Sequence, residues 1–506
     1  MLKLHIYIVA ACLFLQNAPL LAQKNSTPNV VIIYSDDVGY GDISCNGATK
    51  IQTPHIDRIA NMGIRFTNAY ATSSTCTPSR YALLTGEYPW RKEGTGIAAG
   101  NAGSIIDKDQ TTMGDIFQQA GYQTAVIGKW HLGLGGKSGP DWNGSIKPGP
   151  QELGFNYSFI IPATPDRVPC VYVENDRVAN LDPHDPISVS YSKPILDLPT
   201  GKDHPELLTM MYSHGHDQTI INGISRIGYM KGGKSAWWKD EWMADDITEK
   251  AIEFIRKNQS QPFFLYYAIQ DIHVPRVPNP RYIGKSGMGP RGDALVELDD
   301  NTGKILNLLD SLQLTNNTLV IFSSDNGPIL DDGYQDQAVE KLNHHMPAGP
   351  MRGGKYSKFE GGTHLPFLVC WPAVIPKKQV SNALISQVDL IASFARLLQQ
   401  DLPSGAAPDS QDMLDVLLGR SEKGRNNLIV QGSGNGLAII KGNWKYIGPS
   451  KGIPLLKEKN METGNNPLPQ LYDLDNDIGE TVNLATVYPD MVRELSALLE
   501  QVQQRK

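Results

Sequence analysis

The sequence predicts an α/β fold with a large mixed, mostly parallel sheet sandwiched by helices, followed by a smaller C-terminal unit. Short apolar, β-branched runs alternate with helical patterns from about residue 28 to 400. Such alternation is typical of a parallel sheet that helices cover on both faces. The length of 506 residues is the second observation, because it suffices for a large core and for more than one domain.

Five apolar runs, rich in β-branched and aromatic residues, are predicted to be strands. They are NVVIIYS (29–35), QTAVIG (123–128), PFFLYYA (262–268), TLVIFSS (318–324) and LPFLVCW (365–371). Helical spacing of apolar residues predicts helices over 111–120, 245–259, 294–312 and 386–400. Residues 132–245 are rich in Gly, Pro, Asp and His, and we expect functional loops there over one end of the sheet.

The segment DLPSGAAPDSQDM (401–413) predicts a domain boundary, because it is rich in Pro, Gly and small polar residues. We therefore expect a catalytic domain over 28–410 and a C-terminal α+β subdomain over 411–506. NNLIVQGSG, GLAIIKGNWKYIG and LYDLDND predict short antiparallel strands in this subdomain, and residues 489–503 predict a final amphipathic helix.

Residues 1–22 are predicted to be a secretory signal peptide, with Lys3 before an apolar stretch and Ala22 near its end. The alternative, a membrane anchor, is opposed by polar residues and a proline within the stretch. We expect an exported protein, periplasmic or secreted, and no later stretch is apolar enough to span a membrane. The net charge of −7 excludes a general attraction to nucleic acid or to anionic membranes.

Removal of the signal peptide leaves Cys45, Cys76, Cys170 and Cys370, too few for a disulfide framework in so long a chain. One bridge among Cys45, Cys170 and Cys370 stays open. Cys76 lies in TSSTCTPSR (72–80), between hydroxyl residues, a proline and an arginine. This setting makes Cys76 a candidate nucleophile.

Polar residues directly follow four of the predicted strands, at the carboxyl ends where open α/β sheets form their sites. Asp36 and Asp37, together with Asp325 and Asn326, supply oxygen ligands that suit Ca²⁺ or Mg²⁺ and suit Zn²⁺ poorly. The alternative for each pair alone is a helix cap or a turn. The other strand ends carry Lys129, His131 and His273.

Two further cations could reach the same site, although Lys355 alone would be read as part of an exposed flexible loop. Arg80 follows Cys76 by one helical turn, and Lys355 lies in the glycine-rich segment PMRGGKYSKFEGG (350–362). A divalent cation, fixed cations, histidines and a nucleophile suit a tetrahedral oxyanion ester, whose charge such groups stabilise in the transition state. The residues alone therefore predict hydrolysis of a phosphate or sulfate ester and leave the choice open.

Two longer motifs resemble those of type I sulfatases in the alkaline-phosphatase superfamily. They are CTPSRYALLTG (76–86) and GYQTAVIGKWH (121–131), and the similarity runs from about Asn29 to LYDLDNDIGETVNLA (471–485). The resemblance implies an alkaline-phosphatase-like fold. It also implies that a formylglycine-generating maturation enzyme oxidises Cys76 to formylglycine, whose hydrate attacks sulfur.

The resemblance also implies the roles of the other site residues. Asp36, Asp37, Asp325 and Asn326 would hold Ca²⁺, with Mg²⁺ as the alternative ion and with residue 76 beside it. Arg80 and Lys129 would orient the hydrate, and His131 would be the base that releases sulfate. His273 and Lys355 would bind the sulfate and protonate the leaving oxygen, and which of them gives the proton is open.

The segments PATPDRVPCVYVENDRV (162–178) and HDQTIINGISRIGYM (216–230) resemble those of bacterial sulfatases that act on 6-sulfated galactose or N-acetylgalactosamine. Thr164 is the candidate hydroxyl residue near the sulfate, and Asp166 with Arg167 could bind two sugar hydroxyls, the alternative being a loop-stabilising ion pair. His214 and His216 are further candidates for sugar binding. We expect an exo-acting 6-O-sulfatase on host or algal glycans, such as glycosaminoglycan or mucin. The rival functions are a phosphate or phosphonate ester hydrolase and a non-catalytic carbohydrate-binding protein.

Overall fold

The computed structural model describes residues 27–195 and 198–505. Its main sheet has ten strands in the order β15-β2-β14-β13-β1-β12-β4-β5-β6-β7. The predicted signal peptide at 1–22 lies outside the described residues. Within the described part of the chain, no helix is both long and apolar enough to cross a membrane.

The centre of the sheet is parallel, as the sequence predicts. It consists of β13 (Thr318–Ser324), β1 (Asn29–Ser35), β12 (Phe263–Ala268), β4 (Gln123–Lys129) and β5 (Tyr157–Ile161). Every residue of β1, β12 and β13 is buried. Each fully buried Val, Ile, Leu or Phe contributes about 1.5–3 kcal/mol, so these strands form the core of the fold.

The sheet as a whole is mixed, because both of its edges contain antiparallel strand pairs. The fifth predicted strand, β14 (Phe367–Cys370), runs antiparallel to β13 and to β2 (Ile64–Phe66), and β15 (Gln379–Ser381) closes that edge. At the other edge β6 (Val173–Glu174) and β7 (Arg177–Val178) turn back antiparallel. A separate pair joins β3 (Ala69–Tyr70) to β16 (Ile385–Ser386). The predicted fold class is therefore confirmed.

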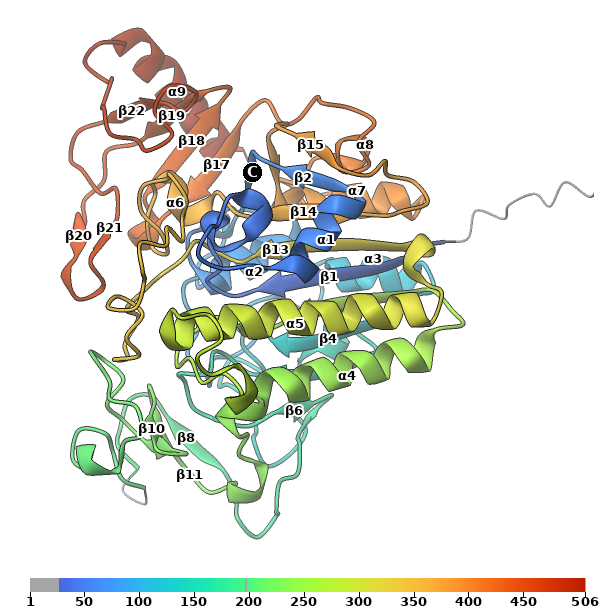
Figure 1. Cartoon of the computed structure of the whole chain (residues 1–506), viewed down its shortest axis with the longest axis vertical. Coiled ribbons are helices and arrows are strands. Elements are labelled where there is room, and N and C mark those ends of the chain that lie inside the picture. The colour runs from blue at the N-terminus through green and yellow to red at the C-terminus, as the bar shows by residue number, and fades with distance from the viewer. Residues whose placement is uncertain (1–26, 196–197, 506) are drawn as a thin grey trace, which may run out of the picture.

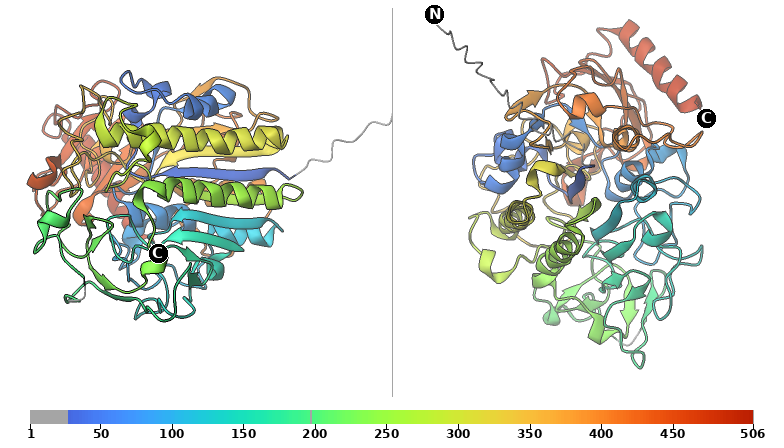
Figure 2. Two further views of the ribbon diagram at one scale, coloured as in Figure 1. Left: turned by 60° about the horizontal axis from the view of Figure 1, so that its bottom comes forward. Right: turned by 90° about the vertical axis from the view of Figure 1, so that its right-hand side faces the viewer.

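Helices cover both faces of the sheet (Figures 1 and 2). On one face α5 (Gly289–Ser311) packs between α1 (Pro54–Met62) and α4 (Met243–Asn258). On the other, α2 (Cys76–Thr85), α3 (Met113–Gln119) and α7 (Leu390–Leu397) contact one another. The short helices α6 (Glu360–Thr363) and α8 (Leu414–Leu417) lie in the segments after β13 and α7.

The C-terminal part contains an antiparallel sheet of β17 (Leu428–Gln431), β18 (Leu437–Lys441), β19 (Trp444–Ile447) and β22 (Gln470–Asp473). The last helix, α9 (Pro489–Gln504), packs on β18 and β19. Between β19 and β22 a small hairpin of β20 (Leu455–Leu456) and β21 (Met461–Glu462) reaches toward the loops at the carboxyl end of the main sheet (Figure 1). The boundary at residue 410 stays a prediction, and α8, which follows it, contacts α7.

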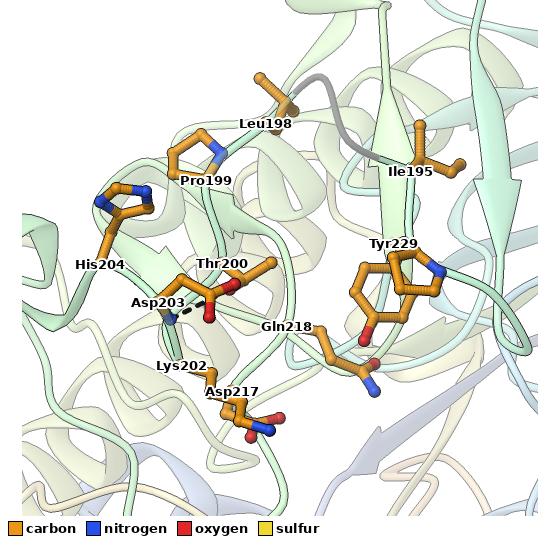
Figure 3. A pocket seen from close by; sticks show the side chains of 11 residues that line it. Ile195, Leu198, Pro199, Thr200, Lys202, Asp203, His204, Asp217, Gln218 and Tyr229 are labelled. Carbon is orange, nitrogen blue, oxygen red and sulfur yellow. Dashed lines mark hydrogen bonds between the residues drawn. The ribbon is translucent and has the colours of Figure 1, made fainter.

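The segment predicted as long loops carries short strand pairs, β8 (Ser188–Ser190) with β11 (Tyr229–Lys231) and β9 (Ile220–Ile221) with β10 (Ile224–Ser225). These loops border an open cavity of about 730 Å³, lined by residues such as Thr200, Asp203, Asp217 and Tyr229 (Figure 3). None of the predicted site residues lines this cavity. A smaller pocket at the carboxyl end of the main sheet is lined by seven of them.

Candidate active site

The four predicted metal ligands meet at one edge of the sheet. β1 and β13 pair in parallel with Ser35 opposite Ser324, so the residues that follow each strand leave it side by side. Asp36, Asp37 and Asp325 each place a carboxylate oxygen within 4.8 Å of the others, and the amide nitrogen of Asn326 donates to Asp37 Oδ1 over 2.7 Å. Register between two parallel strands thus assembles the cluster.

The donor set of this cluster fits a hard divalent cation. All four side chains are buried, and Asp36 Oδ1 and Asn326 Oδ1 have no hydrogen-bond partner in the described residues. Burial and the neighbouring Asp325 raise the pKa of Asp36 to about 8. Buried oxygens without donors and repelling carboxylates are stabilised by an ion such as Ca²⁺ or Mg²⁺.

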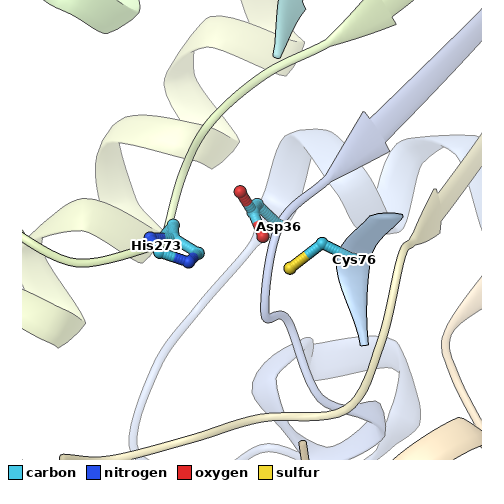
Figure 4. Close-up of side chains that lie close together, drawn as sticks. All are labelled: Asp36, Cys76 and His273. Atoms are coloured by element: carbon cyan, nitrogen blue, oxygen red, sulfur yellow. The ribbon is translucent and has the colours of Figure 1, made fainter. Parts of the chain in front are cut away.

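Cys76 is the first residue of α2 and is buried, like every other residue of that helix. Its sulfur lies near Asp36 and His273 (Figure 4), with ligand atoms of the three residues within 4.8 Å of one another. Burial raises the pKa of the Cys76 thiol to about 12, although Lys129 and Lys355 oppose this shift. The encoded side chain is therefore a neutral thiol rather than a nucleophilic thiolate.

Arg80 and Lys129 are held against the acidic cluster. Arg80, one turn after Cys76, donates to Asp325 Oδ2 from Nε and Nη2 over 3.0 and 2.8 Å. Lys129, the last residue of β4, donates to Asp36 Oδ2 over 2.6 Å. Burial by itself would raise the pKa of Asp325, but these two cations outweigh it and hold that pKa below its usual range. Both cations are therefore fixed beside Cys76.

His131 is buried, with backbone φ of 55°. Its Nε2 lies 3.0 Å from the carbonyl oxygen of Ala98, while Nδ1 has no partner in the described part of the chain. A carbonyl oxygen can only accept a hydrogen bond, so Nε2 of His131 carries the ring proton. Nδ1 therefore has a free lone pair and can accept a proton. Burial and then Lys129 hold the pKa of His131 well below its ordinary value, which keeps the ring neutral.

His273 and Lys355 lie on the other side of the pocket. His273 Nδ1 donates to the carbonyl of Val274 over 2.6 Å, and burial followed by Lys355 lowers its pKa to about 3. Lys355 Nζ donates to Asp37 Oδ2 and to Asp332 Oδ2, each over 2.9 Å. Burial favours a neutral amine, but the two carboxylates outweigh it and raise the pKa of Lys355. Lys355 is thus a fixed ammonium.

These groups line a pocket of about 100 Å³. The predicted residues among its lining are Cys76, His131, Asp166, Arg167, His216, His273 and Lys355. The sequence reasoning missed five further lining residues: Ile97, Ile227, Asp332, Tyr356 and Lys459. Tyr356 adjoins Lys355 in the glycine-rich segment and could have been found there, whereas Lys459 comes from the β20–β21 hairpin, where no motif marks it.

The candidates for sugar binding are only partly brought together. Arg167 Nη1 donates to Thr164 Oγ1 and Asp166 Oδ1 over 2.7 and 3.1 Å, and His216 Nε2 lies 2.9 Å from Asp166 Oδ2. Thr164 and His214 do not line the pocket, and His214 accepts a hydrogen bond from Lys459 instead. Asp166 and Arg167 therefore form the ion pair of the alternative interpretation and also face the pocket.

Cys45, Cys76, Cys170 and Cys370 are all free thiols. The bridge among Cys45, Cys170 and Cys370 that the sequence left open does not form in the described residues. Cys170 and Cys370 are buried, so each acts as a small apolar core residue.

Comparison with known proteins agrees with this geometry. The family described as Sulfatase matches residues 28–400. An N-acetylgalactosamine-6-O-sulfatase of Bacteroides thetaiotaomicron is 58% identical over 484 residues, which are 96% of this chain and 94% of the relative. Human arylsulfatase A is 31% identical over 94% of this chain and 87% of its own.

Solved structures show the same relation. A Bacteroides thetaiotaomicron protein, solved in work on the metabolism of multiple glycosaminoglycans, superposes with a TM-score of 0.94 at 57% identity, over 95% of this chain and 100% of that one. The PsFucS1 sulfatase from Pseudoalteromonas, at 24% identity and a TM-score of 0.68, covers 95% of this chain and 90% of its own and shares the fold.

Fold, site and comparisons together define a hydrolase of sulfuric esters. The chain belongs to the Sulfatase family. The predicted reaction class is confirmed, and the phosphate-ester and non-catalytic alternatives are set aside.

Proposed function

We propose that this sulfatase removes the 6-O-sulfate of N-acetylgalactosamine or galactose at the end of a glycan chain. The observation that carries the proposal is one small pocket in which Cys76 faces fixed cations, neutral histidines and an Asp–Arg pair. The N-acetylgalactosamine-6-O-sulfatase at 58% identity supports the sugar and the sulfate position.

Asp36, Asp37, Asp325 and Asn326 would hold a divalent cation, for which Ca²⁺ is the proposed ion and Mg²⁺ the alternative. When bound, the cation supplies positive charge to the oxygens of the sulfate group. The unpartnered oxygens of Asp36 and Asn326 support this assignment. Cys76 itself would lie beside the ion.

Cys76 is the proposed site of oxidation to formylglycine. The hydrated aldehyde supplies a hydroxyl group as nucleophile, which the neutral thiol of Cys76 does not provide. Arg80 and Lys129 lie where they can orient such a group, because both are locked to the carboxylates next to Cys76. The sequence CTPSR supports a formylglycine-generating enzyme as the maturation partner.

His131 is the proposed base. Its Nδ1 carries no proton and has no partner, so it can take a proton from a hydroxyl group at position 76. On the opposite side, Lys355 and His273 would lie against the sulfate and the leaving sugar oxygen, and one of the two would protonate that oxygen. Lys355 can donate as it stands, whereas neutral His273, whose one proton lies on Nδ1, would first have to take up a proton on Nε2. Lys355 is charged and therefore holds a proton in the resting site.

Asp166 and Arg167 are the proposed contacts to sugar hydroxyls, with His216 holding Asp166 in place. Thr164 would contribute to sugar binding by holding Arg167, and His214 would contribute at the rim of the pocket. The protein would work after export, in the periplasm or outside the cell. No partner of nucleic acid type is expected.

The reaction is tested by ion chromatography of sulfate released from 6-sulfated N-acetylgalactosamine and 6-sulfated galactose, with protein co-expressed with a formylglycine-generating enzyme. We expect sulfate from at least one sugar and none from the Cys76→Ala protein, whose fold is checked by circular dichroism. Turnover in Cys76→Ala would overturn the nucleophile assignment. Activity on neither sugar, with formylglycine at position 76 shown by mass spectrometry, would overturn the substrate.

The sugar contacts are tested with Asp166→Asn and Arg167→Met. Because both side chains face the sugar rather than the sulfate, each change should lower kcat/KM for the glycan by about a hundredfold and leave small aryl sulfates within a few fold. Equal losses on both substrates would make the pair structural.

A further inference from the structure

We propose that Lys459, from the C-terminal part of the chain, is a positioning residue of the active site. Its ammonium holds the carboxylate of Asp332, and Asp332 in turn holds the ammonium of Lys355. The inference rests on the proposed function, in which Lys355 binds the sulfate group. It makes the β20–β21 hairpin a part of the catalytic apparatus.

The contacts form a row of alternating charges. Lys355 Nζ lies 2.9 Å from both Asp37 Oδ2 and Asp332 Oδ2. The other oxygen of Asp332 accepts from Lys459 Nζ and, over 3.0 Å, from the hydroxyl of Tyr356. The row Asp37–Lys355–Asp332–Lys459 thus runs from the metal-ligand cluster to the rim of the pocket. Every member except Lys459 is buried.

Asp332 needs a second cation because of where it lies. Its buried carboxylate lines the pocket that would receive a sulfate anion, together with His273 and Cys76. Left with Lys355 alone, Asp332 would draw that ammonium away from the sulfate and would repel the sulfate itself. Lys459 supplies the balancing charge and leaves Lys355 shared between the two carboxylates.

The hairpin is fastened on both sides of Lys355. Before it in the chain, Arg352 makes a two-pronged ion pair with Glu462, over 2.7 and 2.6 Å. After it, the backbone nitrogen of Lys358 donates to the carbonyl of Thr463 over 3.0 Å.

At Gly354, next to Lys355, a Cβ would lie 2.3 Å from the carbonyl oxygen of Pro328, so glycine is needed for this close approach, and the methyl group of Met461 from the hairpin packs against the same position. Tyr356, with φ of 77°, is held in a sparsely populated conformation by its bonds to Ser74 and Asp332. Through these contacts the hairpin, together with their own loop, determines the positions of Lys355 and Asp332.

The test is a double-mutant cycle with Lys459→Met, Asp332→Asn and the double variant, together with Lys459→Arg. Lys457→Met is the matched control, because Lys457 lies on the same helical turn (Lys457–Lys459) and is exposed. The readouts are kcat and KM on 6-sulfated N-acetylgalactosamine, the affinity for inorganic sulfate by calorimetry, and the melting temperature.

Lys459→Met should weaken sulfate affinity and raise KM by about tenfold, with a smaller change in kcat. The same substitution in the Asp332→Asn background should change both by less than about twofold, because no unbalanced carboxylate remains. Lys459→Arg and Lys457→Met should behave like the wild type. A residue that only stabilises the fold would not show this dependence on Asp332.

An equal cost of Lys459→Met in both backgrounds would overturn the inference, since Lys459 would then act on the substrate directly or through stability alone. So would an unchanged sulfate affinity in Lys459→Met. If the wild type releases no sulfate from any sugar, the proposed function fails instead. Binding of inorganic sulfate needs no turnover and still decides whether Lys459 and Asp332 are linked.

Discussion

Lys355 and Lys358 lie three residues apart on one loop, and both are buried, but they face different parts of the molecule. Lys355 donates to two carboxylates in the active site. Lys358 donates to neutral oxygens of the C-terminal part, Ser450 Oγ over 2.6 Å and Asn465 Oδ1 over 2.9 Å. In the described residues no carboxylate is paired with Lys358.

The two surroundings have opposite effects on the amines. Asp332 and Asp37 overcome burial and raise the pKa of Lys355, whereas burial alone lowers the pKa of Lys358 to about 8. A buried lysine keeps its charge only where carboxylates compensate for the lost hydration. The active site thus maintains a permanent cation, while the contact between the loop and the C-terminal part needs only a hydrogen-bond donor.

The largest expected difference is in turnover. Lys355→Met should lower kcat/KM by about a thousandfold, because a fixed charge on the sulfate group is lost. Lys358→Met, the matched change at a site without substrate, should stay within about threefold of the wild type. Sulfate release by ion chromatography measures both. Similar losses in the two variants would show that the loop acts as one structural unit.

The next largest difference should appear when the bound cation is removed, because only the site of Lys355 lies beside the proposed ion. Lys355 and the proposed ion both neutralise Asp37, so a chelator should destabilise Lys355→Met more than Lys358→Met. The wild type should lose activity and about 3 kcal/mol of stability, the size expected when a ligand near a hundred times its Kd is removed. Differential scanning calorimetry and elemental analysis measure this, and Asn326→Ala should hold less metal. An unchanged melting temperature after complete removal of metal would contradict the cation site.

The smallest effect concerns the pH dependence of stability. The pKa of Lys358 is about 8 when folded and 10.5 when free, so the folded state binds its proton less tightly. The wild type should therefore gain stability from this group as pH rises from 8 to 10.5, and the full penalty applies below pH 8. We expect about 1–2 kcal/mol after allowance for solvent screening.

Lys358→Met should lack that gain and should be at least as stable as the wild type near neutral pH. Urea unfolding at several pH values measures whether the free energy of unfolding rises or falls with pH. The control is Lys457→Met, whose exposed side chain should leave the pH dependence unchanged. A wild type that loses stability between pH 8 and 10.5 relative to Lys358→Met would contradict this account of the buried amine.

Much of the fold could be predicted because hydrophobic periodicity and strand length follow directly from the sequence. The parallel centre and the acidic cluster follow from one rule, that parallel strands end at one edge, which places Asp36 beside Asp325. The antiparallel direction of β14 could not be predicted, since an apolar run looks the same in a parallel and in an antiparallel strand. The formylglycine role proposed for Cys76 and the base role proposed for His131 came from the resemblance of their motifs rather than from spacing.

For other residues of the site, the neighbouring sequence contains no motif that would predict their place in the pocket. Asp332 lies in a loop whose path only the folded chain defines, and Lys459 lies 127 positions further on. A surface lysine and an active-site lysine are indistinguishable in sequence when their partners are this distant. Thr164 and His214 show the reverse case, because the sequence predicts them as substrate contacts while their side chains contact Arg167 and Lys459, which line the pocket themselves.

The burial of α2 sets an order of events in the life of the chain. Every residue from Cys76 to Thr85 is covered in the folded protein, so an enzyme that reads Cys76, Pro78 and Arg80 has no access once folding is complete. On the proposed chemistry, oxidation must precede closure of the fold. If Cys76 is oxidised in the nascent chain, the time that the ribosome takes to reach the later β20–β21 hairpin is available for that oxidation.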